Sequence, residues 1–239
     1  MKTCVLLTGC SKGLGLEICK YLLKNEYLVI GVSRTLSQTV EDLLKNKYFK
    51  HIIADLGDEN SAKHILDEIQ RNEYQVVSFI NNAAVAYDDL ITNLNTALLK
   101  NMYQINVFTP MLLIKGVIRN FLLYNTAGSI INVSSISVHT GYKGLSMYAS
   151  TKGALEALTK NLAREWGERS IRVNNLVCGF METEMSSTLN DEQKNRIYNR
   201  NSLKKPTEIA SVAATIEFLI TDKACSITGQ NIFVDSGTI

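Results

Sequence analysis

The sequence is poor in proline and tryptophan and carries almost no excess of charge of either sign. Its 239 residues include two prolines, Pro110 and Pro206, and one tryptophan, and no stretch rich in Gly and Ser interrupts the chain. Domain boundaries usually fall in exposed linkers rich in such residues, so we expect one domain over residues 1–239. A chain of this length buries about 70–75% of its unfolded surface and needs no disulfide or metal to be stable.

Several protein classes are excluded by what is missing. The five cysteines, at positions 4, 10, 19, 178 and 225, form no C-x-x-C pair, so neither a metal site nor a disulfide framework is indicated. With 25 Lys and Arg against 23 Asp and Glu, the net charge of +2 is too small for charge-driven binding to nucleic acid or a membrane surface. No apolar run approaches the roughly 18 residues of a membrane span. The first eight residues have the pattern of a strand and not of a signal peptide, so we expect a cytoplasmic protein.

Short β-branched runs alternate with segments of helical periodicity along the chain. The runs lie at 4–8, 27–32, 51–54, 76–80, 129–133, 171–176 and 231–234. Strand–helix alternation predicts βαβ units. The fold expected is therefore α/β, a doubly wound parallel sheet of seven strands with helices on both faces. The polar segment 182–203 interrupts the alternation after the sixth strand and is a candidate lid over a binding site.

A glycine-rich turn follows the first predicted strand. Gly9, Gly13 and Gly15 enclose Ser11, Lys12 and Leu14 and lead into a helix. Glycines let a backbone approach a pyrophosphate, and a helix N-terminus favours negative charge. The spacing G-x-x-x-G-x-G differs from the better-known G-x-G-x-x-G. The alternative is a tight strand-to-helix turn that binds nothing.

The end of the second predicted strand bears on which dinucleotide would bind. An acidic residue is expected there to hold a ribose 2′-hydroxyl, but the strand ends in Arg34, and no acid appears before Glu41. A guanidinium suits a 2′-phosphate, and Lys12 adds a second cation on the same side. Both favour NADPH over NADH. The alternative is that Lys12 and Arg34 are solvated surface charges.

Tyr148 and Lys152 are spaced i and i+4 in a helical pattern, which places them on one face. A lysine ammonium beside a phenol favours the phenolate and lowers the tyrosine pKa toward neutrality, so the pair predicts a general acid or base. Ser135 follows the strand 129–133, at the end where ligands bind in open α/β sheets. Asn106 lies in a helical stretch, 98–118. Each of these residues alone also has an ordinary structural explanation.

Taken together, these motifs resemble the short-chain dehydrogenase/reductase family over essentially the whole chain. Within that family the sequence is most similar to the β-ketoacyl-acyl-carrier-protein reductases, which have a Rossmann-type fold. The matching positions are Thr8-Gly9-x-x-x-Gly13-x-Gly15, Asp55, Asn81-Asn82-Ala83, Asn106, Ser135, Tyr148-x-x-x-Lys152, Asn174, Gly179 with Thr183, Gly229-Gln230 and Val234-Asp235.

The resemblance implies a role for each site residue. Tyr148 would protonate a carbonyl oxygen as hydride arrives from the nicotinamide, Lys152 would lower the tyrosine pKa and hold the nicotinamide ribose, and Ser135 would polarise the carbonyl. Asn106 would place a water behind Lys152. The remaining residues implied to contact the cofactor are Asp55 and Leu56 near the adenine, Asn82 and Ala83 near a ribose, and Gly179, Met181 and Thr183 near the carboxamide.

The sequence also departs from the family pattern. Ala84 and Ser236 replace glycines, and Cys178 replaces the proline usual before Gly179. Carrier-protein reductases tend to have basic residues beside the mouth of the active site. Residues 125–127 contain none, whereas Arg169 and Arg172 are present before the sixth strand.

Three functions remain open from the sequence. The first is NADPH-dependent reduction of a β-ketoacyl thioester carried by acyl carrier protein or coenzyme A. The second is the same chemistry on a sugar, polyketide or other secondary-metabolite carbonyl, and the third is a nucleotide-binding sensor without turnover. Apolar residues near Tyr148 could line a substrate pocket, namely Tyr142, Leu145, Met147, Phe180, Met181 and Met185. Apolar side chains on more than one face of the helices at 98–118 and 149–166 predict a homotetramer or dimer.

Overall fold

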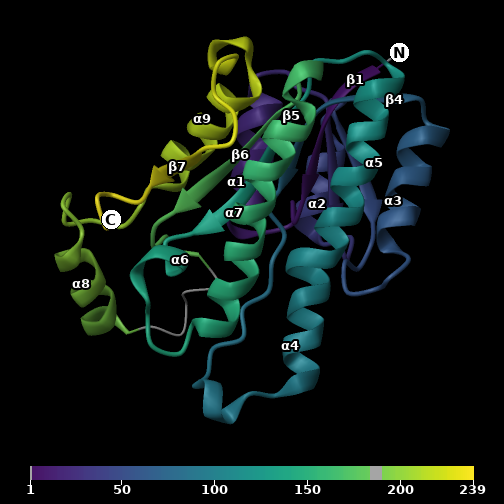
Figure 1. Cartoon of the computed structure of the whole chain (residues 1–239). Coiled ribbons are helices and arrows are strands. Elements are labelled where there is room, and N and C mark those ends of the chain that lie inside the picture. Colours follow the sequence, from purple (N-terminus) through teal and green to yellow (C-terminus); the bar gives the residue numbers. More distant parts are fainter. Residues whose placement is uncertain (1, 184–189) are drawn as a thin grey trace.

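The computed structural model describes residues 2–183 and 190–239, and these form one parallel seven-stranded sheet between two layers of helices (Figure 1). The strand order is β3-β2-β1-β4-β5-β6-β7. The strands are β1 (Lys2–Thr8), β2 (Val29–Ser33), β3 (Phe49–Ile53), β4 (Tyr74–Asn81), β5 (Ser129–Ser135), β6 (Arg172–Cys178) and β7 (Asn231–Val234). The expected doubly wound α/β fold is confirmed, and the predicted strands differ from the observed ones by one or two residues at their ends.

The first helical layer is formed by α1 (Gly13–Lys24), α2 (Gln38–Leu44) and α9 (Ile209–Ile220). Their apolar side chains pack with those of the strands. Ile18 and Leu22 of α1 and Ile216 of α9 are fully buried. Because strands buried on both faces need apolar residues at successive positions, the continuous run Cys4–Leu7 in β1 is buried throughout.

The second layer contains α3 (Ser61–Arg71), α5 (Thr109–Leu123) and α7 (Ser146–Trp166). Between α3 and α5 the chain passes through η1 (Ile91–Asn93) and α4 (Thr96–Tyr103), which extends below the sheet in Figure 1. The short α6 (Ser137–Thr140) directly follows β5. Other short helices of the described chain are η2 (Gln104–Phe108), η3 (Gly167–Arg169) and η5 (Asp222–Ala224).

One helical stretch of the described chain, Thr96–Leu123, is long and apolar enough to cross a membrane by length and composition. Its most apolar window is 56% buried inside the protein. The α5 part contacts α3 and β4, and its side chains Leu113, Val117 and Phe121 are fully buried. We therefore interpret it as a core helix of this fold.

The sheet changes direction between β1 and β4. From β1 the chain adds β2 and β3 on one side, and it then returns to add β4 to β7 on the other. At such a switch point the connections leave the strand ends in opposite directions and open a crevice where ligands bind. The candidate lid at 182–203 follows β6 on this edge. Its residues 184–189 lie outside the described part, and 191–200 form α8 (Asp191–Arg200).

Candidate active site

A cavity of about 690 Å³ opens at the carboxyl ends of the strands. It runs from the turn after β1, past the ends of β2, β4 and β5, to α7 and the segment after β6. Every residue that the sequence predicted to contact the cofactor lines it. These residues are Gly9, Ser11, Lys12, Gly13, Leu14, Gly15, Arg34, Asp55, Leu56, Asn82, Ala83, Tyr148, Lys152, Gly179, Met181 and Thr183. The fold thus brings them together, and their individual roles stay predictions.

The glycine turn has the shape of a backbone cradle. Gly9 and Gly13 have φ angles of +75° and +53°, which side chains rarely tolerate. A Cβ at Gly9 would lie 2.9 Å from Nδ2 of Asn82, whereas a Cβ at Gly13 would make an ordinary contact, 3.8 Å from the Cβ of Thr183, which also lines the cavity. A side chain at Gly13 would therefore occupy the cavity itself. The turn and the N-terminus of α1 fit the pyrophosphate of a dinucleotide.

Asn82 holds the turn in place from β4. Its side-chain amide donates to the backbone oxygens of Thr8 and Gly9, and its backbone N–H donates to the hydroxyl of Thr8. Because both amide protons of Asn82 are used in this way, the side chain fixes the distance between the ends of β1 and β4. We infer that Asn82 shapes the cofactor groove by positioning the glycine turn.

Val32 and Ser33 at the end of β2, and the exposed Arg34 that follows them, line the cavity. The hydroxyl of Ser33 donates to the backbone oxygen of Thr35, at 3.1 Å, and lies 2.8 Å from Nε2 of His51 on β3. With its proton given to Thr35, the hydroxyl accepts from His51. This arrangement fixes the backbone that carries Arg34. Asp55, which follows β3, accepts a hydrogen bond from the N–H of Gly57 and lines the cavity.

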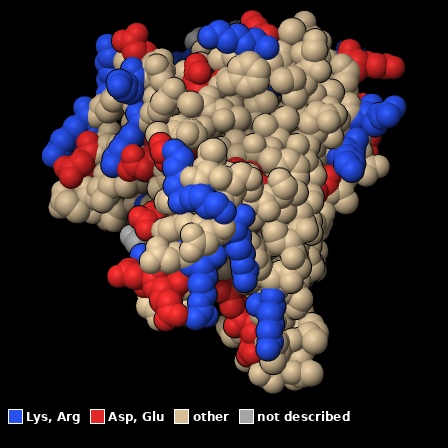
Figure 2. All heavy atoms as spheres, turned by 90° about the vertical axis from the view of Figure 1, so that its left-hand side faces the viewer, with Lys and Arg blue, Asp and Glu red and all other residues tan. Residues whose placement is uncertain are grey.

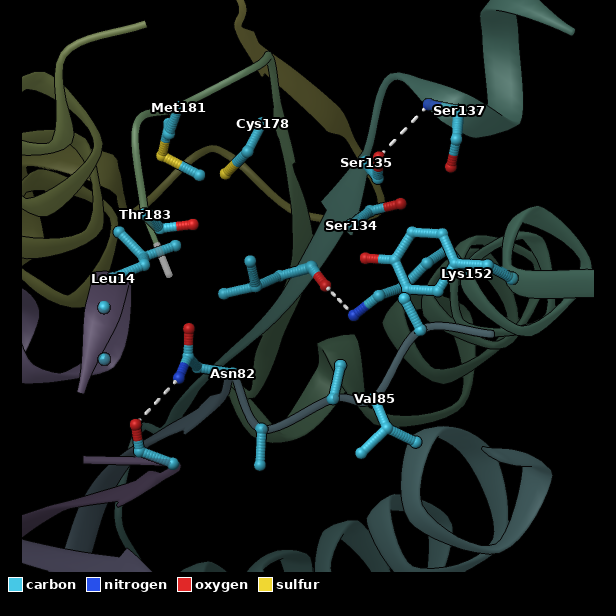
Figure 3. Close-up of a pocket in the computed structure, with 18 of the residues that line it drawn as sticks. Leu14, Asn82, Val85, Ser134, Ser135, Ser137, Lys152, Cys178, Met181 and Thr183 are labelled. Carbon is cyan, nitrogen blue, oxygen red and sulfur yellow. Dashed lines mark hydrogen bonds between the residues drawn. The ribbon is translucent and has the colours of Figure 1, made fainter. Parts of the chain in front are cut away.

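Tyr148 and Lys152 lie one helical turn apart at the start of α7. Figure 3 shows Lys152 and, at the end of β5, Ser135. The Ser135 hydroxyl lies close enough to the phenol of Tyr148 to lower its pKa, and its oxygen accepts from the N–H of Ser137, at 3.2 Å. The ammonium nitrogen of Lys152 lies 5.7 Å from the centre of the Tyr148 ring. The three side chains that the sequence grouped by spacing thus converge on one point of the cavity.

The expected lowering of the Tyr148 pKa is wrong for this structure. Burial raises the pKa of Tyr148 above its ordinary value of 10, and negative charge on Cys178 or Asp88 would raise it further, whereas the nearby Ser135 hydroxyl lowers it. Desolvation disfavours the phenolate more than Ser135 stabilises it. The consequence is a phenol that keeps its proton at neutral pH.

Lys152 is fully buried, and burial lowers its pKa to about 8. Its ammonium donates to the backbone oxygen of Val133 on β5, at 2.8 Å (Figure 3). The side chain therefore spans from α7 to β5 and holds a proton that it can lose near neutral pH. A group with these properties can pass a proton on as well as carry a charge.

Asn106 lies behind this pair and does not line the cavity. It sits in η2 (Gln104–Phe108), a π-helical turn between α4 and α5, where the sequence indicated regular helix. Its side-chain oxygen accepts from the N–H of Val85, and its amide donates to the backbone oxygen of Val85 and to the hydroxyl of Thr151. Asn106 thus ties the cavity wall after β4 to α7. The water that it is predicted to place stays a prediction.

A buried carboxylate that sequence reasoning missed lies one turn beyond Lys152. Glu156 accepts from the hydroxyl of Ser134 at 2.6 Å, from the ring of His139 at 3.1–3.2 Å and from the amide of Asn231 at 2.7 Å. These donors come from β5, α6 and β7. Because Ser134 precedes Ser135 and α6 follows it, the network holds Ser135 from both sides. The donors are distant in sequence from Glu156, so no local pattern could have revealed them.

The predicted apolar pocket is confirmed in part. Tyr142, Leu145, Phe180 and Met181 line the cavity, whereas Met147 faces the core and Met185 lies outside the described residues. The cavity wall also includes charged residues that the sequence did not single out, namely Asp88, Lys143 and Arg200.

Arg169 and Arg172 do not lie beside the cavity. They stand in η3 and at the amino end of β6, after the 21 residues of α7. Tyr148 is near the other end of that helix, about 30 Å away at 1.5 Å per residue. A parallel sheet collects all amino ends at one edge and all carboxyl ends at the opposite one, so basic residues before a strand are far from a site after it.

Comparison with known proteins finds relatives that match almost the whole chain. A family model described as enoyl-(acyl carrier protein) reductase matches residues 9–238. Carbonyl reductase [NADPH] 2 of Sus scrofa is 32% identical over 97% of this chain and 94% of its own length. A 3-oxoacyl-[acyl-carrier-protein] reductase of Buchnera aphidicola is 31% identical over 99% of this chain and 97% of its own. L-xylulose reductase of Caenorhabditis elegans is 29% identical over 98% and 94%.

Solved structures are similar over the whole fold. A 4-hydroxyisoleucine dehydrogenase complexed with NADH superposes with a TM-score of 0.94 at 25% identity, covering 100% of this chain and 98% of that one. A protein named ElxO with NADP bound gives 0.91 at 27% identity, covering 100% and 99%.

Proposed function

Because the chain belongs to the short-chain dehydrogenase/reductase family, we propose that it is an NADPH-dependent reductase that converts a ketone to a secondary alcohol. The observation that carries the proposal is the meeting of Ser135, Tyr148 and Lys152 in the same cavity as the glycine turn. A non-catalytic sensor would not need a protonated phenol beside a hydroxyl donor. The proposal treats residues 1–239 as one catalytic domain.

Ser135, Tyr148 and Lys152 would position the ketone and give its oxygen a proton. The Ser135 hydroxyl would donate a hydrogen bond to the ketone oxygen, and the Tyr148 phenol would give that oxygen its proton. Lys152 would return a proton to Tyr148 from the interior, where its pKa of about 8 keeps it close to exchange with solvent. The nicotinamide supplies the hydride that reduces the carbonyl carbon. Donors aimed at a developing alkoxide stabilise the transition state more than the ground state.

We propose NADPH as the preferred cofactor because Lys12 and Arg34 both line the groove near the end of β2. A 2′-phosphate there would meet a guanidinium that can donate two parallel hydrogen bonds. The similarity to a carbonyl reductase named for NADPH supports this choice. The similarity to a dehydrogenase with bound NADH makes NADH the alternative to be tested.

For the substrate we propose a β-ketoacyl thioester, bound to acyl carrier protein or to coenzyme A. The support is the similarity to 3-oxoacyl-[acyl-carrier-protein] reductases and the apolar wall formed by Leu145, Phe180 and Met181, which suits an acyl chain. A sugar-like carbonyl is the second candidate, because the chain is also similar to an L-xylulose reductase and because Asp88 places a carboxylate in the same wall.

The direct test is consumption of NADPH and of NADH, side by side, with an acetoacetyl thioester and with xylulose. Fast oxidation of NADPH with the thioester and little with xylulose supports the proposal in full. Turnover with xylulose alone would replace the substrate but keep the chemistry. The absence of turnover with every carbonyl compound in the presence of tightly bound NADPH would favour the sensor.

We further propose that the protein works as a homotetramer or dimer in the cytoplasm. Large apolar side chains are exposed along α4, η2 and α5, including Leu98, Phe108, Leu112 and Leu123. A second copy packed on these helices would cover them. The five cysteines are free, and four are buried, which suits a reducing compartment. Sedimentation velocity tests the assembly, since a monomer of 26.6 kDa would contradict it.

A further inference from the structure

Two cationic side chains line the cavity but have no role in the proposed reduction. Lys143 lies in the loop between α6 and α7, and Arg200 is the last residue of α8. Both side chains are exposed. Among the residues described, neither has a carboxylate within salt-bridge distance, although Asp55 and Asp88 line the same cavity.

Three of the other cations on and beside α8 are paired with carboxylates, whereas Lys204 donates to the backbone oxygen of Asn199. Arg196 meets Glu192 at 2.6 Å, Lys205 meets Glu208 at 2.6 Å, and Lys194 lies 4.0 Å from Glu182. Figure 2 shows this face of the molecule, where Lys and Arg side chains alternate with Asp and Glu. Their charges are therefore largely balanced locally. Arg200 is the basic residue of α8 that lines the cavity, and no carboxylate of the described residues lies within salt-bridge distance of it.

The position of Arg200 is fixed from both sides. The next residue, Asn201, is fully buried, and its side chain donates to the backbone oxygen of Lys205 and accepts from the hydroxyl of Thr238. Two residues before Arg200, the phenol of Tyr198 donates to Glu182 at 2.6 Å, and its ring packs 6.0 Å from that of Phe180. Phe180 belongs to the cavity wall. These contacts hold the end of α8 against the substrate part of the cavity.

Cations held at a cavity wall and left without partners are suited to an anionic ligand. Arg presents a planar fork that matches a carboxylate or a phosphate, and Lys adds a mobile point charge. We propose that Arg200 and Lys143 form an anion subsite, which binds a carboxylate or phosphate that the substrate carries beyond its ketone. This inference rests on the proposed ketone reduction and narrows its substrate class to ketones with an anionic group.

The experiment compares pairs of ketones in which one member carries an anionic group and the other does not. One pair is 5-oxohexanoate and its methyl ester, and the other is acetoacetyl-CoA and acetoacetyl-N-acetylcysteamine. Steady-state rates with NADPH are measured for the wild type, Arg200→Gln and Lys143→Gln. Loss of one charge-assisted hydrogen bond corresponds to roughly a tenfold rise in KM. We expect this rise for an anionic substrate, with unchanged kcat and with unchanged KM for its neutral partner.

Arg196→Gln is the matched control, because Arg196 is a cation on the same helix that does not line the cavity. It should leave all four KM values unchanged. If KM rises in Arg200→Gln and Lys143→Gln for 5-oxohexanoate alone, the ligand of the subsite is a carboxylate. If KM rises for acetoacetyl-CoA alone, the ligand is a phosphate. Equal effects on charged and neutral partners, or no effect on any, would overturn the subsite.

A binding measurement separates failure of the subsite from failure of the proposed function. Titration calorimetry with acetoacetyl-CoA, in the presence of saturating NADP⁺, reports affinity without turnover. The subsite predicts about tenfold weaker binding by Arg200→Gln and a further loss at high ionic strength, which screens exposed charges. If the wild type reduces no ketone but the variant binds more weakly, the subsite stands and the reaction is wrong. Equal dissociation constants would reject the subsite whatever the activity.

Discussion

Replacing Arg34 with glutamine is expected to weaken the binding of NADPH and to leave that of NADH unchanged. A hydrogen bond to a charged group contributes about 1.5–3 kcal/mol. Because Arg34 is exposed at the rim of the groove, the lower end applies, which is about a tenfold rise in the dissociation constant. The backbone around Arg34 should not move, since Ser33 and His51 hold it. Arg34→Asp should go further and improve NADH, because its carboxylate can accept from a 2′-hydroxyl.

The assay is fluorescence titration of both cofactors with the wild type and each variant, together with kcat/KM for the same ketone. Arg71→Gln is the control, because Arg71 pairs with Glu68 on the surface of α3 and lies outside the cavity. An unchanged ratio of NADPH to NADH affinity in Arg34→Gln would refute the reasoning. It would mean that Arg34 is a solvated charge and that the preference, if there is one, arises elsewhere.

Three further predictions concern the residues behind the cavity. The reduction rate should fall as the pH rises through about 8, because Lys152 then loses its proton while Tyr148, whose pKa is raised, stays protonated; stopped-flow oxidation of NADPH measures this, and a rate that rises over the same range would contradict it. Asn106→Ala removes three hydrogen bonds and should lower the free energy of unfolding in urea by about 2–3 kcal/mol, whereas a loss below about 0.5 kcal/mol would show that they contribute little. Glu156→Ala leaves three donors without their acceptor and should cost about 3 kcal/mol by the same assay; the exposed Glu165 provides the control, and equal stability of the two variants would argue against the network.

The sequence was sufficient for features that depend on neighbours along the chain. The turn at Gly9–Gly15, the pair Tyr148 and Lys152, and Ser135 at the end of its strand were all predicted, and the structure brings them into one cavity. Each is set by local spacing combined with one topological rule, namely that the carboxyl ends of parallel strands meet at one edge.

Features that depend on tertiary packing were not predictable in this way. The raised pKa of Tyr148 comes from burial, which spacing does not report. The π-helical turn at Asn106 forms where that side chain bonds Val85 and Thr151, 21 and 45 residues away. Arg172 was expected near the mouth of the site, but its place at the amino end of β6 puts it at the opposite edge of the sheet.

The measurement that tests the central claim most directly is single-turnover oxidation of bound NADPH by a ketone in the wild type and in Tyr148→Phe. Phenylalanine keeps the ring that packs in the cavity and removes the proton donor alone. The account predicts unchanged affinity for NADPH and a rate lowered by about 100- to 10,000-fold, the range typical of a general acid. A variant that binds NADPH normally and reduces the ketone at the wild-type rate would show that Tyr148 does not supply the proton.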